Sequence, residues 1–290
     1  MTQQDLLQSV RRIEIKTKGL SNNIFAGEYH SAFKGRGMSF SEVREYQFGD
    51  DIRDIDWNVT ARFGKPFVKV YEEERELTVM LMVDVSGSLY FGTKEKTKRE
   101  QVTEIAATLA FSAIENNDKV GVVFFSDKIE KFIPPKKGRK HILLIIRELL
   151  SFEPESKSTN IGHALEFLTN AMKRRSTVFV MSDFYDPNDF KKQLTILNRK
   201  HDVIALQVYD WRMKELPDVG LIKMQDAETG KELYVDSSSA SVRQQHRMWW
   251  DAQQKKISQV FTHSNVDSIS VRTDEDYVVS LRKLFLRRNI

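Results

Sequence analysis

Apolar runs and amphipathic stretches alternate along most of this chain. Five short runs rich in Val, Ile, Leu, Met and Phe predict buried strands over residues 77–83, 120–125, 177–182, 202–209 and 267–271. Apolar residues at helical spacing predict helices over residues 96–116, 138–150, 161–173, 188–199, 243–261 and 276–286. Residues 128–133 alternate as an edge strand does, and Pro134-Pro135 predicts where that strand ends. Strands and helices in alternation predict an α/β fold with a doubly wound, mostly parallel sheet of the Rossmann type.

This alternation occupies residues 76–290, which we expect to form the main domain. Within it, two strand-like runs flank Asp226 to Gly230 and predict an inserted β-hairpin at about residues 218–237. Residues 1–75 differ in character. They start with an amphipathic helix predicted over residues 3–18, continue as a Gly-, Arg- and Asp-rich stretch, and are expected to pack on the main domain as a loop-rich extension.

The stretch Asp84-Val85-Ser86-Gly87-Ser88 directly follows the first predicted strand of the main domain. Open α/β sheets bind ligands at the carboxyl ends of their strands, so this loop stands where a ligand would bind. A carboxylate followed at two-residue intervals by hydroxyls puts three oxygen donors in one tight turn. Because hard divalent cations such as Mg²⁺ prefer oxygen ligands, the loop is a partial metal site.

Two later segments can complete this site. Thr159 lies in a predicted loop that enters a helix, and Asp183 follows the strand predicted over residues 177–182. A lone Asp-x-Ser-x-Ser loop is usually no more than a set of helix caps. Here three separate segments each supply an oxygen donor at the end of a predicted element, which favours the metal site.

This pattern resembles the von Willebrand factor A-like family, whose metal-ion-dependent adhesion site combines a D-x-S-x-S loop, a distant Thr and a later Asp. The matching residues are Asp84, Ser86, Ser88, Thr159 and Asp183. The resemblance implies a cation, Mg²⁺ with Mn²⁺ or Ca²⁺ as alternatives, bound directly by the three hydroxyls and through water by the two carboxylates. It also implies an open position on the cation that an acidic side chain of a protein partner fills.

In the N-terminal extension, glycines, arginines and aspartates alternate with aromatic residues at the period of neither a helix nor a strand. We expect an ordered loop held by Arg–carboxylate pairs. A purely structural role is one interpretation, and a docking surface for a partner is the other, because Arg and aromatic residues are enriched at binding hot spots. The docking residues would be Arg36, Arg44, Asp50, Arg53, Asp54, Asp56 and Trp57.

The block from Ser31 to Gly37, with Gly49 to Trp57 and Glu72 to Leu77, is similar to the signature of a bacterial domain-of-unknown-function family. In that family the block precedes a von Willebrand factor A-like domain. Such proteins are typically encoded beside MoxR-type AAA+ ATPases. The resemblance therefore implies a metal-dependent adaptor or partner of such an ATPase, acting on a protein client.

Composition narrows the classes of function. The 45 Lys and Arg against 41 Asp and Glu leave a net charge of +4, a small excess that is weak evidence for nucleic-acid binding. The basic clusters at residues 136–140 and 173–175 fit helix ends, and Trp249-Trp250 fits partial burial, so no nucleic-acid partner is expected. The chain has no Cys, no signal-peptide pattern at its start and no run near the ~20 apolar residues of a membrane span. We expect a cytoplasmic protein.

These observations favour a non-enzymatic, Mg²⁺-dependent protein-interaction module. The alternative is a metal-dependent hydrolase or phosphoryl-transfer enzyme, in which the same cation would activate a water molecule. His163 and Asp127 are the weak candidates for a base, and no G-x-S-x-G or D-x-D-x-T motif is present. His163 falls on the opening turn of a predicted helix, where packing or capping is the more common role.

Overall fold

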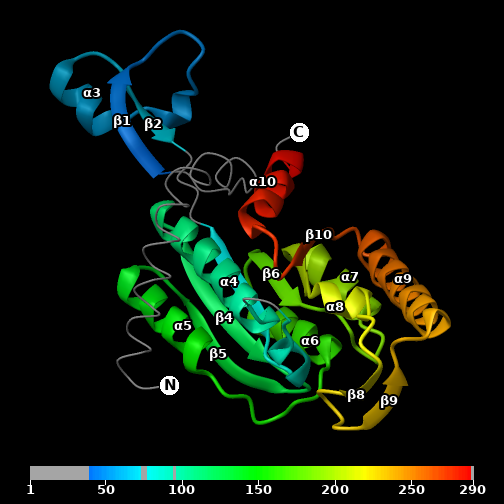
Figure 1. Cartoon of the computed structure of the whole chain (residues 1–290). Helices are drawn as coiled ribbons and strands as arrows, with labels where there is room; N and C mark the ends of the chain where they lie inside the picture. Colours follow the sequence, from blue (N-terminus) through cyan, green and yellow to red (C-terminus); the bar gives the residue numbers. More distant parts are fainter. Residues whose placement is uncertain (1–38, 73–76, 94–95, 289–290) are drawn as a thin grey trace. The chain divides into compact units, whose positions relative to one another are not determined.

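The computed structural model describes residues 39–72, 77–93 and 96–288 (Figure 1). The helix predicted over residues 3–18 and the Gly35-Arg36-Gly37 motif lie outside the described residues, and so does the predicted domain boundary at residue 75. The chain divides into two compact units, one over Phe33–Leu77 and the other containing Thr78–Ile290.

The smaller unit is built on an antiparallel pair, β1 (Ser39–Glu45) and β2 (Phe67–Glu72). The prediction of loop is wrong for β1, because Ser39 pairs with Glu72, a partner that local periodicity cannot reveal. Residues 46–51 do form a loop. It leads to the short elements η2 (Ile52–Asp54) and α3 (Trp57–Phe63).

The larger unit carries a six-stranded sheet in the order β10-β7-β6-β3-β4-β5 (Figure 1). Its strands are β3 (Thr78–Asp84), β4 (Lys119–Phe125), β5 (Ile129–Lys136), β6 (Thr177–Ser182), β7 (Asp202–Tyr209) and β10 (Asp267–Arg272). Every neighbouring pair is parallel except β4 with β5, which confirms the predicted mostly parallel sheet.

Helices cover both faces of this sheet. The long ones are α4 (Lys98–Glu115), α5 (Arg139–Ser151), α6 (Ile161–Ala171), α7 (Lys191–Lys200), α9 (Ala240–His263) and α10 (Tyr277–Arg288). Alternate residues of β3 divide between two cores: Met80 and Met82 pack with α6, α7 and α9, and Leu81 faces the other way and is equally buried. On that second face α4 packs against α5 and β3, and its Thr108 hydrogen-bonds Tyr277 of α10.

A short helix and a β-hairpin precede α9. Helix α8 (Trp211–Lys214) was not predicted, whereas the predicted hairpin is present as β8 (Leu221–Gln225) and β9 (Glu232–Asp236), which pair with each other in antiparallel fashion. Within the described ranges, no helix is long and apolar enough to cross a bilayer.

The edge strand β5 continues through Pro134-Pro135, beyond its predicted end. This is possible because β5 pairs with β4 alone and its register shifts beside Gly121. A Cβ on Gly121 would lie 2.9 Å from both the carbonyl oxygen of Ile133 and the nitrogen of Pro135. The missing side chain of Gly121 therefore lets the proline-containing backbone approach β4 closely.

The order of the strands defines where a ligand can bind. From β3 the chain passes to β4 on one side, and it later returns to place β6 on the other side of β3. Ligands of open α/β sheets bind at the carboxyl ends of the strands where the direction of winding reverses. Here that point lies at the carboxyl ends of β3 and β6.

We expect Gly121→Ala to lower the free energy of unfolding by about 1–3 kcal/mol, because an added methyl group would overlap the backbone of β5. Gly162→Ala in α6 is the matched control, since its Cβ would meet its nearest neighbours at ordinary distances of 3.5 Å or more. Urea denaturation followed by circular dichroism measures both. Equal stability of the two variants would contradict the close approach.

The burial of His201 should make the free energy of unfolding depend on pH. His201 follows α7, is 1% exposed, and its Nδ1 accepts a hydrogen bond from the Ser176 amide at 3.2 Å. Burial lowers its pKa to about 4, so the folded protein keeps the neutral ring where the unfolded chain, near pH 6.5, takes up a proton. The neutral ring therefore makes its full contribution to the free energy of unfolding above pH 6.5, and that contribution is lost as the pH falls towards 4.

The comparison with His201→Gln isolates this effect. Between pH 7 and 4.5 the wild type should lose roughly 2 kcal/mol more unfolding free energy than the variant. The carboxylates that titrate in the same range are common to both proteins. If the unfolding free energies of the wild type and His201→Gln fell in parallel with pH, the His201 ring would not be held neutral.

Candidate functional site

Two buried carboxylates meet at the ends of adjacent strands. Asp84 is the last residue of β3, Asp183 follows β6, and both are 1% exposed. The Ser182 hydroxyl donates a hydrogen bond to Asp84 Oδ2 at 2.6 Å, and the Ser86 amide donates to Oδ1 at 2.8 Å. Burial, and then the charge of Asp183, raise the pKa of Asp84 to about 7. Positive charge placed beside this pair would relieve their repulsion.

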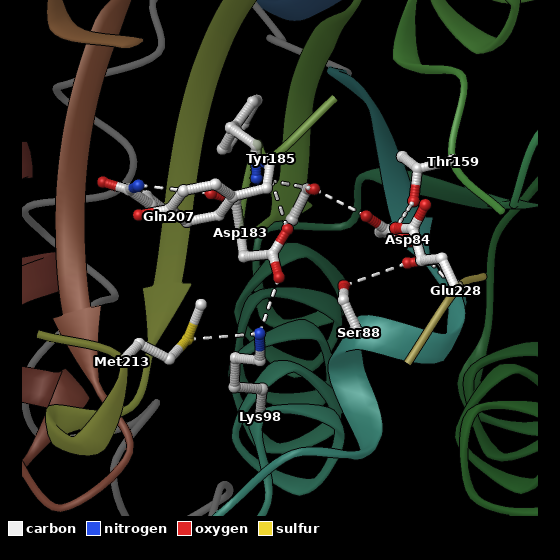
Figure 2. Close-up of polar contacts among 12 residues, drawn as sticks. Asp84, Ser88, Lys98, Thr159, Asp183, Tyr185, Gln207, Met213 and Glu228 are labelled. Carbon is white, nitrogen blue, oxygen red and sulfur yellow. Dashed lines mark hydrogen bonds and ion pairs between the residues drawn. The ribbon is translucent and has the colours of Figure 1, made fainter. Parts of the chain in front are cut away.

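The predicted hydroxyl donors lie at the same edge of the sheet. Ser86 Oγ and Ser88 Oγ are 3.2 Å apart, and the Gly87 amide donates a 2.8 Å hydrogen bond to the Lys157 carbonyl. That bond joins the loop after β3 to the segment that carries Thr159. Thr159 is itself buried, with 4% of its surface exposed. Figure 2 shows Asp84, Ser88, Thr159 and Asp183 gathered in one region.

A third carboxylate, which the sequence did not predict, enters this region from the hairpin. Thr159 Oγ1 donates a 2.6 Å hydrogen bond to Glu228 Oε1, so a predicted ligand already contacts an acidic side chain of the same chain (Figure 2). Burial raises the pKa of Glu228, with Asp183 and Asp226 adding repulsion. The turn from Asp226 to Gly230 was visible in the sequence, but no local signal placed it against Thr159.

A buried lysine neutralises part of this charge. Lys98, the first residue of α4, is 1% exposed, and its Nζ donates a 2.6 Å hydrogen bond to Asp183 Oδ2. The Tyr185 amide donates to Asp183 Oδ1 at 3.2 Å. A lysine at the start of an amphipathic helix is normally solvent-exposed, which is why sequence reasoning missed this contact.

The donor set suits a hard divalent cation. Three carboxyl groups, Asp84, Asp183 and Glu228, lie in this region with one amino group, Lys98, so acidic groups are in excess where a divalent cation would bind. In the described part of the chain, no group of three or more His, Cys, Asp and Glu side chains is placed to hold a metal ion. A cation bound here would therefore depend on the hydroxyls of Ser86, Ser88 and Thr159.

The residues considered as catalytic bases are engaged elsewhere. The His163 amide is capped by Asn160 Oδ1 at 2.9 Å, and the ring Nδ1 lies 3.2 Å from the Asp127 carbonyl oxygen. Asp127 Oδ1 lies 3.3 Å from Ser126 Oγ, whose hydroxyl donates at 2.6 Å to Glu130 Oε1. Asn160 is therefore the residue that caps α6, and His163 is an exposed residue of its opening turn.

In the smaller unit, several of the predicted docking residues have structural partners. Arg44 donates two hydrogen bonds of 2.8 Å to the Asp50 carboxylate, and Asp56 caps α3 by accepting from the Asn58 and Val59 amides. The bond from Arg44 lowers the pKa of Asp50, which agrees with the predicted Arg–carboxylate pairs.

Other residues of that unit remain exposed. Arg53 and Asp54 lie on η2, Trp57 is 68% exposed, and Arg36 is outside the described residues. Three further large apolar side chains are exposed here, namely Phe48, Ile52 and Phe63. The structure therefore gives part of the predicted docking set a structural role and leaves several large apolar side chains exposed on the same unit.

Lys98→Met should lower the free energy of unfolding by about 3 kcal/mol, because it leaves the Asp183 carboxylate buried without its cationic partner. The double variant Lys98→Met/Asp183→Asn should recover part of that loss. A double-mutant cycle by urea denaturation measures the coupling. Strictly additive effects would contradict a direct ion pair.

Comparisons of sequence and structure relate the chain to known proteins. The chain is 29% identical to the uncharacterized protein Rv1480 of Mycobacterium tuberculosis over 287 residues, which cover 98% of this chain and 90% of that protein. A solved aerotolerance-related membrane protein from Bacteroides fragilis shares the fold, with a TM-score of 0.50, 16% identity, and coverage of 73% of this chain and 98% of that one. A von Willebrand factor type A structure from Catenulispora acidiphila covers 50% of this chain and 35% of its own, at 12% identity and a TM-score of 0.37. Residues 42–256 match the family described as protein of unknown function DUF58, and the chain belongs to that family.

Proposed function

We propose that this protein is a non-enzymatic interaction module that binds Mg²⁺ at the ends of β3 and β6 and captures an acidic side chain of a protein partner. The observation that carries the proposal is the convergence of Ser86, Ser88 and Thr159 on a region that already holds two buried carboxylates. Hydroxyls and carboxylates are the ligands that Mg²⁺ prefers.

Each residue has a role in this proposal. Ser86, Ser88 and Thr159 would ligate the cation through neutral oxygens, and Asp84 and Asp183 would bond to it through water. Lys98 offsets the charge of Asp183. The bound cation would supply an electrophilic centre that accepts a carboxylate. Because the three hydroxyl ligands are neutral, they would compensate little of its charge, which favours the binding of a carboxylate.

The proposed partner is a MoxR-type AAA+ ATPase, with which the protein would act on a protein client in the cytoplasm. Support comes from the resemblance of the block from Gly49 to Trp57 to proteins encoded beside such ATPases. The exposed aromatic and Arg side chains of the smaller unit would offer a second contact surface.

Ser86→Ala should weaken Mg²⁺ binding at least about tenfold, because it removes one oxygen ligand from the site. Isothermal titration calorimetry measures the binding. Affinity purification of the tagged protein from its native extract, with Mg²⁺ or with a chelator, then measures recovery of the ATPase, which should require both Mg²⁺ and Ser86.

Ser258→Ala is the matched control, since this serine lies on an exposed position of α9. It should bind Mg²⁺ and the ATPase as the wild type does. Recovery of the ATPase from the wild type in chelator would move the interface away from this site. Retained Mg²⁺ affinity in Ser86→Ala would exclude its hydroxyl as a ligand.

A further inference from the structure

The tip of the hairpin lies directly on the loop that follows β3. A Cβ added to Gly87 would meet the Ala227 carbonyl oxygen at 2.4 Å and the Lys157 Cβ at 3.2 Å. No side chain fits between the two segments at this position. The hairpin backbone is therefore packed against the Asp-x-Ser-x-Ser loop, one residue away from both Ser86 and Ser88.

The turn holds Glu228 in a defined position. Asp226 Oδ1 accepts hydrogen bonds from the Glu228 amide at 3.0 Å and the Thr229 amide at 2.7 Å. The Gly230 amide donates to the Asp226 carbonyl at 2.8 Å and closes the turn. These bonds constrain the backbone on both sides of Glu228 and direct its carboxylate to the Thr159 hydroxyl (Figure 2).

Glu228 is half-buried and shares its region with the like charge of Asp183. Lys98, the neighbouring ammonium, donates to Asp183. A carboxylate is an unfavourable group to hold against another buried carboxylate unless a cation lies between them. The same carboxylate, 2.6 Å from a proposed metal-binding hydroxyl, has the chemistry that the proposed site recognises in a partner.

We propose that Glu228 is the chain's own carboxylate ligand of the cation, so that the resting site is closed in cis and a partner's acidic side chain must displace it. This inference rests on the proposed function. On this proposal, the partner binds by replacing the Glu228 carboxylate on the cation with one of its own. The hairpin that carries Glu228 then competes with the partner for the cation.

The hairpin is built in a way that permits this exchange. Strands β8 and β9 pair with each other and form a separate two-stranded sheet, which is marginally stable by itself. Leu221, Leu233 and Tyr234 are 71%, 64% and 65% exposed, so little apolar burial holds the strands to the body. At the base, the Ser237 amide donates to the Gly220 carbonyl, and Gly220 has a φ of +83°. The base is anchored by this bond, so a partner that replaces the Glu228–Thr159 contact would need to displace only the tip.

The test compares Glu228→Gln with Glu232→Gln in the full-length protein. Glutamine keeps the shape of the side chain and the contact with Thr159 but removes the charge. Glu232 is the matched control, because it lies on the same hairpin in an exposed ion pair with Lys223. Mg²⁺ alone is the probe, titrated by calorimetry and followed by hydrogen–deuterium exchange of the amides in the turn.

The wild type and Glu232→Gln should bind Mg²⁺ equally, and Mg²⁺ should slow amide exchange in the turn. Glu228→Gln should bind Mg²⁺ about tenfold more weakly and lose that slowing. Gly87→Ala, which displaces the tip while keeping Glu228, should also lose the Mg²⁺-dependent slowing of amide exchange in the turn. Equal Mg²⁺ affinity and equal exchange in the wild type and Glu228→Gln would overturn the inference and leave the proposed function standing. Failure of the wild type to bind Mg²⁺ would overturn both.

Discussion

The gathering of negative charge in a buried place is the constraint on which the structure of this region depends. A parallel sheet brings the carboxyl ends of β3 and β6 together, and each end carries an acidic residue that is 1% exposed. Hydrogen bonds from Ser182 and from backbone amides satisfy the oxygens but leave the charges facing each other. Helix α4 supplies the amino group of Lys98, which donates a hydrogen bond to Asp183. The start of that helix is fixed by the capping box of Thr97 and Glu100. The helix is thereby anchored at its N-terminus by a cap and an ion pair together.

Much of the larger unit could be predicted because its signals are local. Strands buried on both faces read as continuous apolar runs, and the helices between them show a clear period. The tryptophan pair illustrates the same logic: adjacent residues on a helix point in different directions, and Trp250 is 3% exposed while Trp249 is 49% exposed. Trp249 stacks on Tyr185 at 6.0 Å between ring centroids. The predicted donors lie beside element ends, Asp84 and Asp183 at the ends of strands and Thr159 before α6, which is why their placement at one edge of the sheet could be predicted.

Apart from the short helix α8, the features that sequence reasoning missed depend on contacts between distant segments. Residues 39–45 form a strand because β2 pairs with them. Strand β5 extends past its predicted end because Gly121, which has no side chain, lets the backbone of Pro134 and Pro135 approach β4. Lys98 and Glu228 are separated from Asp183 and Thr159 by 85 and 69 positions. Nothing in the composition of α4 or of the hairpin distinguishes these two side chains from solvated ones. Their roles emerge when the sheet brings their partners to the same edge.

The two prolines of β5 have a consequence for the outer side of the sheet. Pro134 and Pro135 both lie in β5, which is the edge strand of the sheet. A proline nitrogen carries no hydrogen, and a strand of another molecule that approached this edge would find a donor missing from the ladder. Exposed edges of this kind are where chains join into aggregates, and prolines are one of the means by which proteins prevent it. The sheet thus ends at β5 by its chemistry as well as by its connectivity.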